Sequence, residues 1–475
     1  MNTKYVHIKS TSYYIIVCIL LIFEKSTNYT SLAMLLVIGI SIFLLLMRKT
    51  NFADVCMTGL ILPGEVWVLL MLLISLSALL IKEQKLIIPV CYTKIKLCLI
   101  VIILLSILNT ICIGGLYNTL FYFFYLFFVL FFALSYRENV HERYLYEICI
   151  ALCWVQFVLV VLEIFITRRI VPGDNYYGSL KDAHEFGVWL LFMITFMGYH
   201  LKSSNSIRKS ITLCTTFACL LMLYLADAKH VVLAYLMGLF LYSILYIIKI
   251  KKKIIAAIVL FSIVAFYIGI FTLESPFVKQ FIEQNSNGFS IYLYDNNYNY
   301  KYHYFYGTIS EDLTGIHFLT GYGLGKYGSR GANLFAYNIM YRNQNALNRF
   351  IEAHFSPFYI NEYKKYAEVY TDNLVQNIKW RSAVLTYPFS SFLAFIAENG
   401  IIGVFCWSII TSCLFKNSNR KLLFSFFVMV CLFDLYIDRI NVIGTLIILL
   451  SAKNKDSRVN EKNSFYNAFS PSRRC

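Results

Sequence analysis

The stretch LCLIVIILLSILNTICIGG, from Leu97 to Gly115, decides the fold class of this chain. It contains no Asp, Glu, Lys or Arg. At a helical rise of about 1.5 Å per residue, it is long enough to cross the roughly 30 Å hydrocarbon core of a bilayer. The stretch therefore predicts a transmembrane helix.

Runs of the same kind recur along the chain. Hydrophobic residues make up 59% of the sequence, charged residues only 14%, and the mean hydropathy is +0.63, which excludes an ordinary soluble protein. The sequence predicts an all-α, polytopic membrane helix bundle with about 11–13 transmembrane helices. The first short run has no small-residue cleavage site after it and is expected to be a retained helix. The long runs are 31–47, 60–81, 97–115, 117–135, 147–166, 185–200, 210–225, 231–248, 254–272, 399–415 and 422–437, and the short runs are 13–23 and 440–452.

The net charge of +16 is spread over short loops and the C-terminal tail, so it does not indicate nucleic-acid binding. An excess of Lys and Arg in short loops is typical of the cytoplasmic side of a membrane. Three basic loops and the tail after Ala452 are therefore expected in the cytoplasm, and the intervening loops on the outer side. The basic loops are 202–209, 249–253 and 416–421, and the outer segments are 167–184, 226–230 and the large loop described below.

The number of runs conflicts with the charge rule near the N-terminus. Ten spans before the large loop would place the N-terminus outside, together with Arg48 and Lys49. Two alternatives remove one crossing. Either Pro63 and Gly64 break the third run into a re-entrant helix, or the first run is short enough to lie in the membrane interface.

Between Glu274 and Ala383 the apolar pattern gives way to polar sequence with fifteen tyrosines, seven of them in 291–307. Aromatic faces stack on sugar rings and amides bind hydroxyls, so this loop suits a sugar chain. The alternative is a tyrosine-rich loop lying on the membrane interface. Amphipathic patterns in 345–353 and 360–380 predict helices within it. The predicted organisation is 1–273 N-terminal transmembrane helices, 274–383 a large, mainly helical extracytoplasmic loop, 384–452 C-terminal transmembrane helices, and 453–475 a basic cytoplasmic tail.

The outer segment 167–184 is short but rich in charged groups. It contains Arg168, Arg169, Lys181 and His184. Cations and an imidazole at the mouth of a helix bundle suit capture of a diphosphate and transfer of a proton. The alternative for His184 is a helix-capping role on a wet surface.

A second charged group, Asp227, Lys229 and His230, interrupts two apolar runs at the expected outer face. Charged residues beside apolar spans are costly and are functional candidates for that reason. Lys229 is a candidate ligand of a lipid-linked pyrophosphate, because its ammonium is a strong point charge. The alternative is a charged turn in which Asp227 pairs with Lys229.

The large loop also contains a glycine-rich passage, with Gly321, Gly323 and Gly325 near Arg330. Glycines let backbone amides approach an anion or a sugar closely. The passage has neither the context of a dinucleotide-binding motif nor that of a P-loop. The histidines are scattered and no HExxH motif occurs, so chemistry without a metal or other cofactor is expected.

Together these passages resemble the O-antigen polymerase and O-antigen ligase superfamily. ADAKHVVLAYLMG (226–238) is similar to the family's basic signature at the outer end of a helix, and GYGLG (321–325) to its GxGxG segment. PFSSFLAFIAENGIIG (388–403) is similar to its closing passage, and GSLKDAHEFGVWLL (178–191) to an outer loop before a helix start. The resemblance extends over the architecture of nearly the whole chain, through short motifs.

The resemblance implies a GT-C-like glycosyltransferase, multi-pass in the inner membrane of a Gram-negative cell and active in lipopolysaccharide biosynthesis. A Wzy-type polymerase would move the growing glycan from undecaprenyl pyrophosphate to a new lipid-linked repeat unit at the periplasmic face. A chain-length regulator and a flippase would be its partners. The implied catalytic residues are His184, Lys229 and Arg330, with His184 as the base. Pyrophosphate or substrate contacts would come from Arg168, Arg169, Lys181, His230, Arg381 and the three glycines, and Glu398 would be structural.

Two departures from the family pattern matter. Lys229 stands where Arg is usual, which retains the charge but loses bidentate contact. Phe389 stands where ligases commonly have a His, which favours a polymerase over a ligase acting on lipid A core. A transporter of lipid-linked oligosaccharide is the third alternative; it would be expected to show internal repeats and short loops, whereas one loop dominates here.

Overall fold

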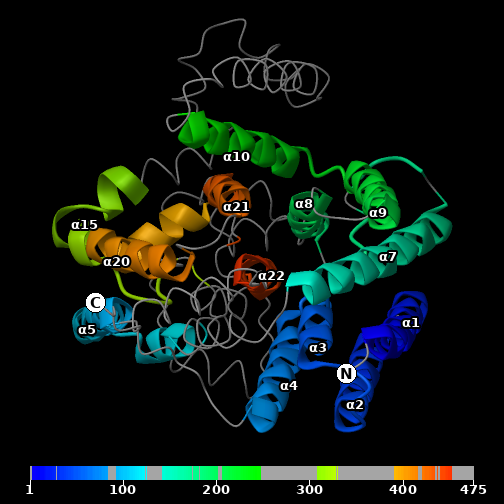
Figure 1. The fold of residues 1–475 in the computed structure, drawn as a ribbon. Coiled ribbons are helices and arrows are strands. Elements are labelled where there is room, and N and C mark those ends of the chain that lie inside the picture. The colour runs from blue at the N-terminus through cyan, green and yellow to red at the C-terminus, as the bar shows by residue number, and fades with distance from the viewer. Residues whose placement is uncertain are drawn as a thin grey trace, which may run out of the picture. The chain divides into compact units, whose positions relative to one another are not determined.

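The computed structural model describes residues 3–27, 29–83, 93–123, 125, 142–168, 170–173, 175–180, 182–201, 206–247, 308–327, 329, 390–415, 420–433, 436 and 439–451. Within these ranges every regular element is a helix and no strand occurs (Figure 1). Four of the described helices are long and apolar enough to cross a membrane, namely Lys94–Ile113, Glu142–Thr167, Ser206–Leu225 and Ser391–Cys413. The prediction of an all-helical chain is confirmed for the described residues, and these helices are consistent with a membrane protein.

The chain forms two compact units, each assembled from segments that are distant in sequence. Unit 1 comprises Met1–Ile88, Val129–Val231 and Ile440–Cys475, and unit 2 comprises Pro89–Phe128 and Val232–Arg439. The predicted division into 1–273, 274–383, 384–452 and 453–475 concerns the membrane and its two sides, and it stays a prediction.

In unit 1, α1 (Thr3–Thr27) and α7 (Glu142–Thr167) lie side by side and run in the same direction. Tyr14 and Tyr144 both reach Asp54, and further along Lys25 pairs with Glu163. The helix α2 (Thr30–Leu46) packs against α1 and follows it after a short turn (Figure 1). The helix α1 is 25 residues long and packs lengthwise on α7, and the interpretation of its apolar run as an interfacial segment stays a prediction.

The predicted break at Pro63 and Gly64 is confirmed. The helix α3 (Phe52–Gly59) ends before them and α4 (Glu65–Glu83) begins after them. The two helices pack antiparallel: a Cβ on Gly59 would lie 2.6 Å from Met71 Cβ, and Ser75 Oγ donates to Phe52 O at 2.7 Å. Since α4 runs back past the start of α3, the α3–α4 hairpin begins and ends toward the same end of unit 1.

The remaining helices of unit 1 are α8 (Ala183–His200), α9 (Ser206–Leu225), the first residues of α10 (Lys229–Ile247) and α22 (Ile440–Ser451). At one end of the unit, His200 Nε2 lies 3.2 Å from Glu142 and Arg208 lies 3.9 Å from Glu147. At the other end, Gly173 N–H donates to Leu225 O at 2.9 Å, so the α7–α8 loop meets the end of α9. The α7–α8 loop is residues 170–182, of which 174 and 181 lie outside the described residues.

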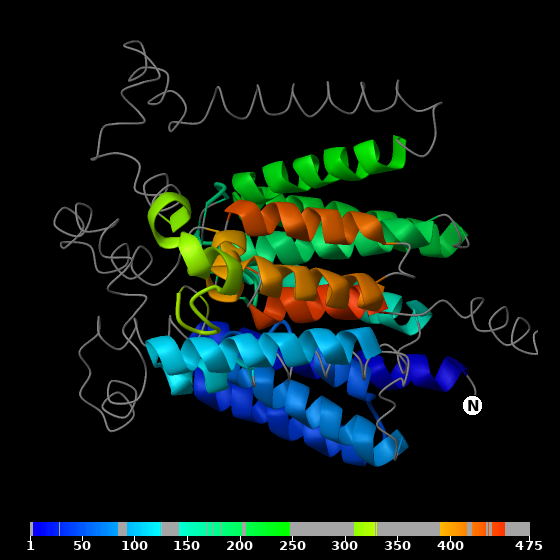
Figure 2. The ribbon, with the colours of Figure 1, turned by 90° about the vertical axis from the view of Figure 1, so that its left-hand side faces the viewer.

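Unit 2 is built around α5 (Thr93–Ile113) and α20 (Ser391–Phe415), which pack on each other, with α21 (Lys421–Phe433) beside α20 (Figure 2). A π-helix at Thr308–Asp312 and the short α15 (Gly315–Thr320) come from the predicted large loop. The helix α20 is interrupted at Gly400, which has φ 62°. A Cβ there would lie 2.3 Å from Leu319 O, so this break lets α15 approach α20. The helices predicted in 345–353 and 360–380 lie outside the described residues.

Candidate functional site

Two buried polar side chains of α7 fasten the α7–α8 loop to unit 1. Gln156 accepts the backbone N–H of Ser179 at 2.9 Å and donates to its hydroxyl at 2.5 Å. Glu163 accepts the backbone N–H groups of Tyr177 and Gly178, each at 3.2 Å. Buried polar groups are costly unless they are paired, so these contacts favour one position of the loop. The loop therefore folds back onto α7.

A buried ion pair completes this attachment. Lys25, at the end of α1, pairs with Glu163, and the two side chains are only 10% and 6% exposed. The Lys25 Nζ also lies 3.8 Å from the centre of the Tyr177 ring, a cation–π arrangement. A buried charge pair is tolerated when each charge has further partners, which the two loop amides and the ring supply. As a result α1, α7 and the loop are joined at one point.

The α7–α8 loop leads into α8, where two histidines meet. Asp182 is the N-cap of α8 and accepts the backbone N–H of His184 at 2.8 Å, so the interpretation of His184 as the capping residue is wrong. The ring of His184 lies 4.1 Å from the ring of His230, centre to centre, with 62° between their planes. Both histidines are half-buried. The two imidazoles thus form one pair at the end of unit 1.

A close helix approach makes this pairing possible. A Cβ on Gly187 would lie 2.7 Å from Ala228 Cβ, so a side chain there would push α8 away from the turn before α10. In that turn Asp227 has φ 50°, a left-handed conformation that Asp tolerates better than most residues. The turn places Lys229 and His230 in the first turn of α10, next to α8.

Lys229 pairs with Asp227, as the alternative interpretation predicted. Its Nζ lies 3.0 Å from one carboxylate oxygen and 3.3 Å from the other. The Lys229 side chain is 49% exposed, and exposed ion pairs contribute only about 0–1 kcal/mol. An anionic ligand could therefore replace Asp227 at little cost, so this ion pair is compatible with a binding role for Lys229.

The other cations predicted for this end are less well placed. Arg168 is exposed directly after α7, with φ 53°. Arg169 and Lys181 lie outside the described residues. The structure thus brings together His184, Lys229 and His230, and it places Arg168 at the same end of unit 1.

In unit 2, the glycine loop (residues 321–329, with 328 outside the described residues) encloses the carboxylate of Glu398. That carboxylate accepts the N–H groups of Gly325 at 2.8 Å, Tyr327 at 3.0 Å and Ser329 at 2.9 Å. The backbone carbonyl of Glu398 accepts the N–H of Gly323 at 3.0 Å. These amides are therefore used to hold the loop on α20, whereas the sequence suggested that they face a ligand.

The glycines of this loop are explained by close backbone contacts. A Cβ on Gly321 would lie 2.4 Å from Glu398 O, and a Cβ on Gly325 would lie 2.4 Å from Asn118 O. Both residues have positive φ, +70° and +77°. A larger residue would meet steric conflict and backbone strain at once. The passage is buried, and its glycines permit the close backbone contacts that shape the loop.

Lys326 is a buried cation that the sequence reading missed. Its Nζ donates to Asn109 O at 3.2 Å and to Thr110 Oγ1 at 3.3 Å. Burial lowers the pKa of Lys326 to about 8, and the charge of Glu398 partly offsets that decrease. Asn118 Nδ2 also donates to Gly325 O at 3.0 Å. Polar residues within the apolar sequence ILNTICIGGLYNT were the available signal for these contacts.

Arg330 and Arg381 lie outside the described residues. Among the residues that the structure describes, no three His, Cys, Asp or Glu side chains are grouped as a metal site would require. No protein-family model matches this chain, and no curated protein matches its sequence. The case for a function therefore depends on the residues and their geometry.

Proposed function

We propose that this protein is an O-antigen polymerase, a glycosyltransferase of the bacterial inner membrane that builds a surface polysaccharide. It would transfer the growing glycan from undecaprenyl pyrophosphate to a new lipid-linked repeat unit at the periplasmic face. The observation that carries the proposal is the contact between His184 and His230 at one end of unit 1, with Lys229 next to His230 in the first turn of α10. These residues come from two separate passages on which the resemblance to the polymerase family rests.

The reaction needs a cation for the leaving group and a base for the acceptor. The acceptor hydroxyl oxygen bonds to the anomeric carbon while the bond from that carbon to the pyrophosphate oxygen breaks. Lys229, released from Asp227, would stabilise the pyrophosphate, and Arg168 is exposed at the same end of unit 1. His184 would accept the hydroxyl proton, with the ring of His230 fixing its orientation. Roles for Arg169, Lys181, Arg330 and Arg381 remain part of the proposal.

The directions of the helices in unit 1 support a periplasmic position for the proposed site. Arg143 and Arg208 lie at the end of unit 1 opposite the α7–α8 loop. With this basic end in the cytoplasm, the α7–α8 loop and Lys229 face the periplasm. The α3–α4 hairpin returns to the end at which it begins; in this proposal it would remove one crossing, and the N-terminus and Arg48 would lie in the cytoplasm. A green fluorescent protein fused to the N-terminus should then fluoresce, and a dark fusion present in normal amount would contradict this topology.

The polymerase proposal is tested by deleting the gene in its native cell and separating the lipopolysaccharide on a gel. A lipid A core that carries a single repeat unit is expected. Bare core with polymer still built on the lipid carrier would indicate the ligase instead. Bare core with no extracytoplasmic glycan would indicate the transporter.

Complementation with single variants then tests the site. Lys229→Ala and His184→Ala should each reduce polymer by about 100-fold or more, the usual effect of removing a charge-stabilising or proton-transferring group. Immunoblots of the membrane fraction establish that each variant is present. Lys209→Ala is the matched control, because Lys209 is an exposed lysine near the start of α9, at the opposite end of unit 1. A full-length glycan ladder from Lys229→Ala would remove that residue from the mechanism.

A further inference from the structure

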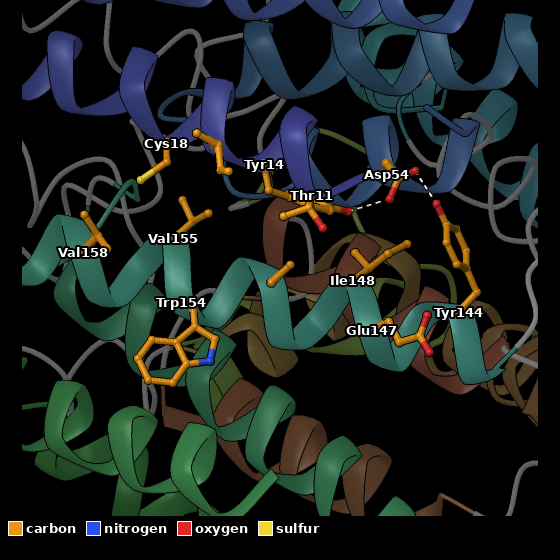
Figure 3. A pocket seen from close by; sticks show the side chains of 12 residues that line it. Thr11, Tyr14, Cys18, Asp54, Tyr144, Glu147, Ile148, Trp154, Val155 and Val158 are labelled. Atoms are coloured by element: carbon orange, nitrogen blue, oxygen red, sulfur yellow. Dashed lines mark hydrogen bonds between the residues drawn. The ribbon is translucent and has the colours of Figure 1, made fainter. Parts of the chain in front are cut away.

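A slot between α1 and α7 has the shape and polarity of a lipid-binding site. It is a cavity of about 310 Å³ with walls from α1, α3 and α7 (Figure 3). One end is polar and the other is apolar. The polar end is formed by Thr11, Tyr14, Asp54, Tyr144 and Glu147, and the apolar part by Ile15, Cys18, Ile148, Ala151, Trp154, Val155 and Val158.

The polar end presents hydrogen-bond acceptors. Asp54 is fully buried, and its carboxylate accepts bonds from the hydroxyls of Tyr14, Tyr144 and Thr50 and from the N–H of Asn51. A carboxylate has about four lone-pair positions, so Asp54 is saturated. The two phenols have therefore donated their only proton, and their oxygens can act only as acceptors toward a ligand. Glu147 also lines the slot, but its carboxylate lies apart from these phenol oxygens (Figure 3) and close to Arg143 and Arg208.

Charged groups near this end match both parts of a zwitterionic head group. The two phenolic oxygens suit an ammonium, which can donate several hydrogen bonds. Arg143 and Arg208 each lie 3.9 Å from Glu147 and can reach a phosphate next to that ammonium. A primary amine fits this arrangement better than a quaternary one, because a quaternary ammonium has no N–H to donate.

The apolar wall runs along the helix axes. From Ile148 to Val158 it is about 15 Å long at the helical rise, close to the roughly 15 Å depth of one bilayer leaflet. Because α7 is long and apolar enough to cross a membrane, this axis would run across the bilayer. Ile15 and Trp154 on this wall are exposed, Trp154 by 41%. The slot is therefore polar at one end and apolar beyond it, in the same order as the head group and the acyl chains of a lipid.

We propose that this slot binds one phospholipid with a primary-amine head group from the leaflet at the basic end of unit 1. Its ammonium donates to the oxygens of Tyr14 and Tyr144, its phosphate lies toward Arg143 and Arg208, and one acyl chain lies along Trp154. The lipid bridges α1, α7 and the start of the α3–α4 hairpin. The inference is independent of the proposed glycosyl transfer, since no residue of the slot takes part in it.

The fluorescence of Trp154 provides the test. The full-length protein is reconstituted in nanodiscs of phosphatidylglycerol, into which phosphatidylethanolamine with brominated acyl chains is titrated. The contribution of Trp154 is the difference between wild type and Trp154→Phe. We expect it to be quenched at about tenfold lower mole fraction than by brominated phosphatidylglycerol, the effect of one charge-assisted hydrogen bond. Equal quenching by the two lipids would overturn the proposal.

Two tyrosine variants separate the head-group contact from general packing. Tyr144→Phe removes one acceptor with almost no change of shape and should abolish most of the preference for the amine lipid. Tyr146→Phe is the matched control, because Tyr146 bonds to Thr212 on α9 and does not line the slot. An equal loss in both variants would overturn the proposal. Ala151→Leu, which fills the apolar wall, should reduce quenching by either lipid, and unchanged quenching would place the lipid elsewhere.

Discussion

The α7–α8 loop of unit 1 and the glycine loop of unit 2 are held in the same way but with different partners. In each, a buried glutamate on an apolar helix accepts backbone N–H groups of the loop. Glu163 accepts two of them and also pairs with Lys25 of another helix. Glu398 accepts three, and they come from within five residues of one loop. The first attachment joins the loop to two helices, whereas the second holds one loop on a single helix, α20.

This difference suggests different tasks for the two loops. The α7–α8 loop is attached through its inner side, while Lys229 and Arg168 at the same end stay exposed. The glycine loop is buried along the described residues from Gly321 to Tyr327, and its amides are used for its own structure. This difference supports the proposal that the chemistry takes place at the end of unit 1 next to the α7–α8 loop, with a supporting role for the glycine loop.

The largest effect on stability is expected for Glu398→Ala. It leaves three buried N–H groups without their acceptor, and each such group costs about 1–3 kcal/mol, so a loss of about 5 kcal/mol is expected. Thermal unfolding of the purified protein in detergent measures it. Glu398→Gln keeps one acceptor oxygen and should lose clearly less. If Glu398→Ala unfolds at the wild-type temperature, the glycine loop does not depend on this residue.

A smaller effect, about 3 kcal/mol, is expected for Lys25→Met, because it leaves Glu163 as a buried charge without its cation. The double variant Lys25→Met with Glu163→Gln should recover most of the loss, since Gln is neutral and its oxygen still accepts a loop amide. Lys209→Met, which removes an exposed lysine, controls for the general effect of lost charge. A double variant that is less stable than Lys25→Met alone would show that the ion pair does not set the stability of this region.

Much of the helical framework could be predicted from the sequence, because apolar runs report burial directly. The run from Leu97 to Gly115 corresponds to α5, and Pro63 with Gly64 marks the break between α3 and α4. The contact of His184 with His230 joins two segments that were both expected on the outer side, and the side of the membrane itself stays a prediction. That expectation required only that successive transmembrane helices cross the membrane in opposite directions, so that every second loop lies on the same side.

The partners of buried polar groups could not be predicted in this way. Glu163 and Asn109 stand out as polar residues within apolar runs, but a run does not reveal what lies opposite. Lys326 meets Asn109 across 217 positions, and Glu398 meets Gly325 across 73. Such pairs depend on how helices pack, and hydrophobic periodicity identifies only the buried face of each helix.

The smallest predicted effect is a dependence of stability on pH that only the glycine loop should show. Burial lowers the pKa of Lys326 from 10.5 to about 8, so the folded protein holds this proton less tightly than the unfolded chain. Between these values the unfolded state binds more protons, and stability must therefore rise with pH, by on the order of 2 kcal/mol. As the pH is raised from about 7.5 to about 10.5, the unfolding temperature of wild type should rise relative to that of Lys326→Met. The folded and unfolded pKa values of Lys326 set this pH window. Lys229→Met, which removes an exposed lysine, should keep the rise. Parallel curves for wild type and Lys326→Met would mean that Lys326 titrates like an exposed lysine, and the contrast between a buried supporting loop and an exposed functional end would lose its electrostatic basis.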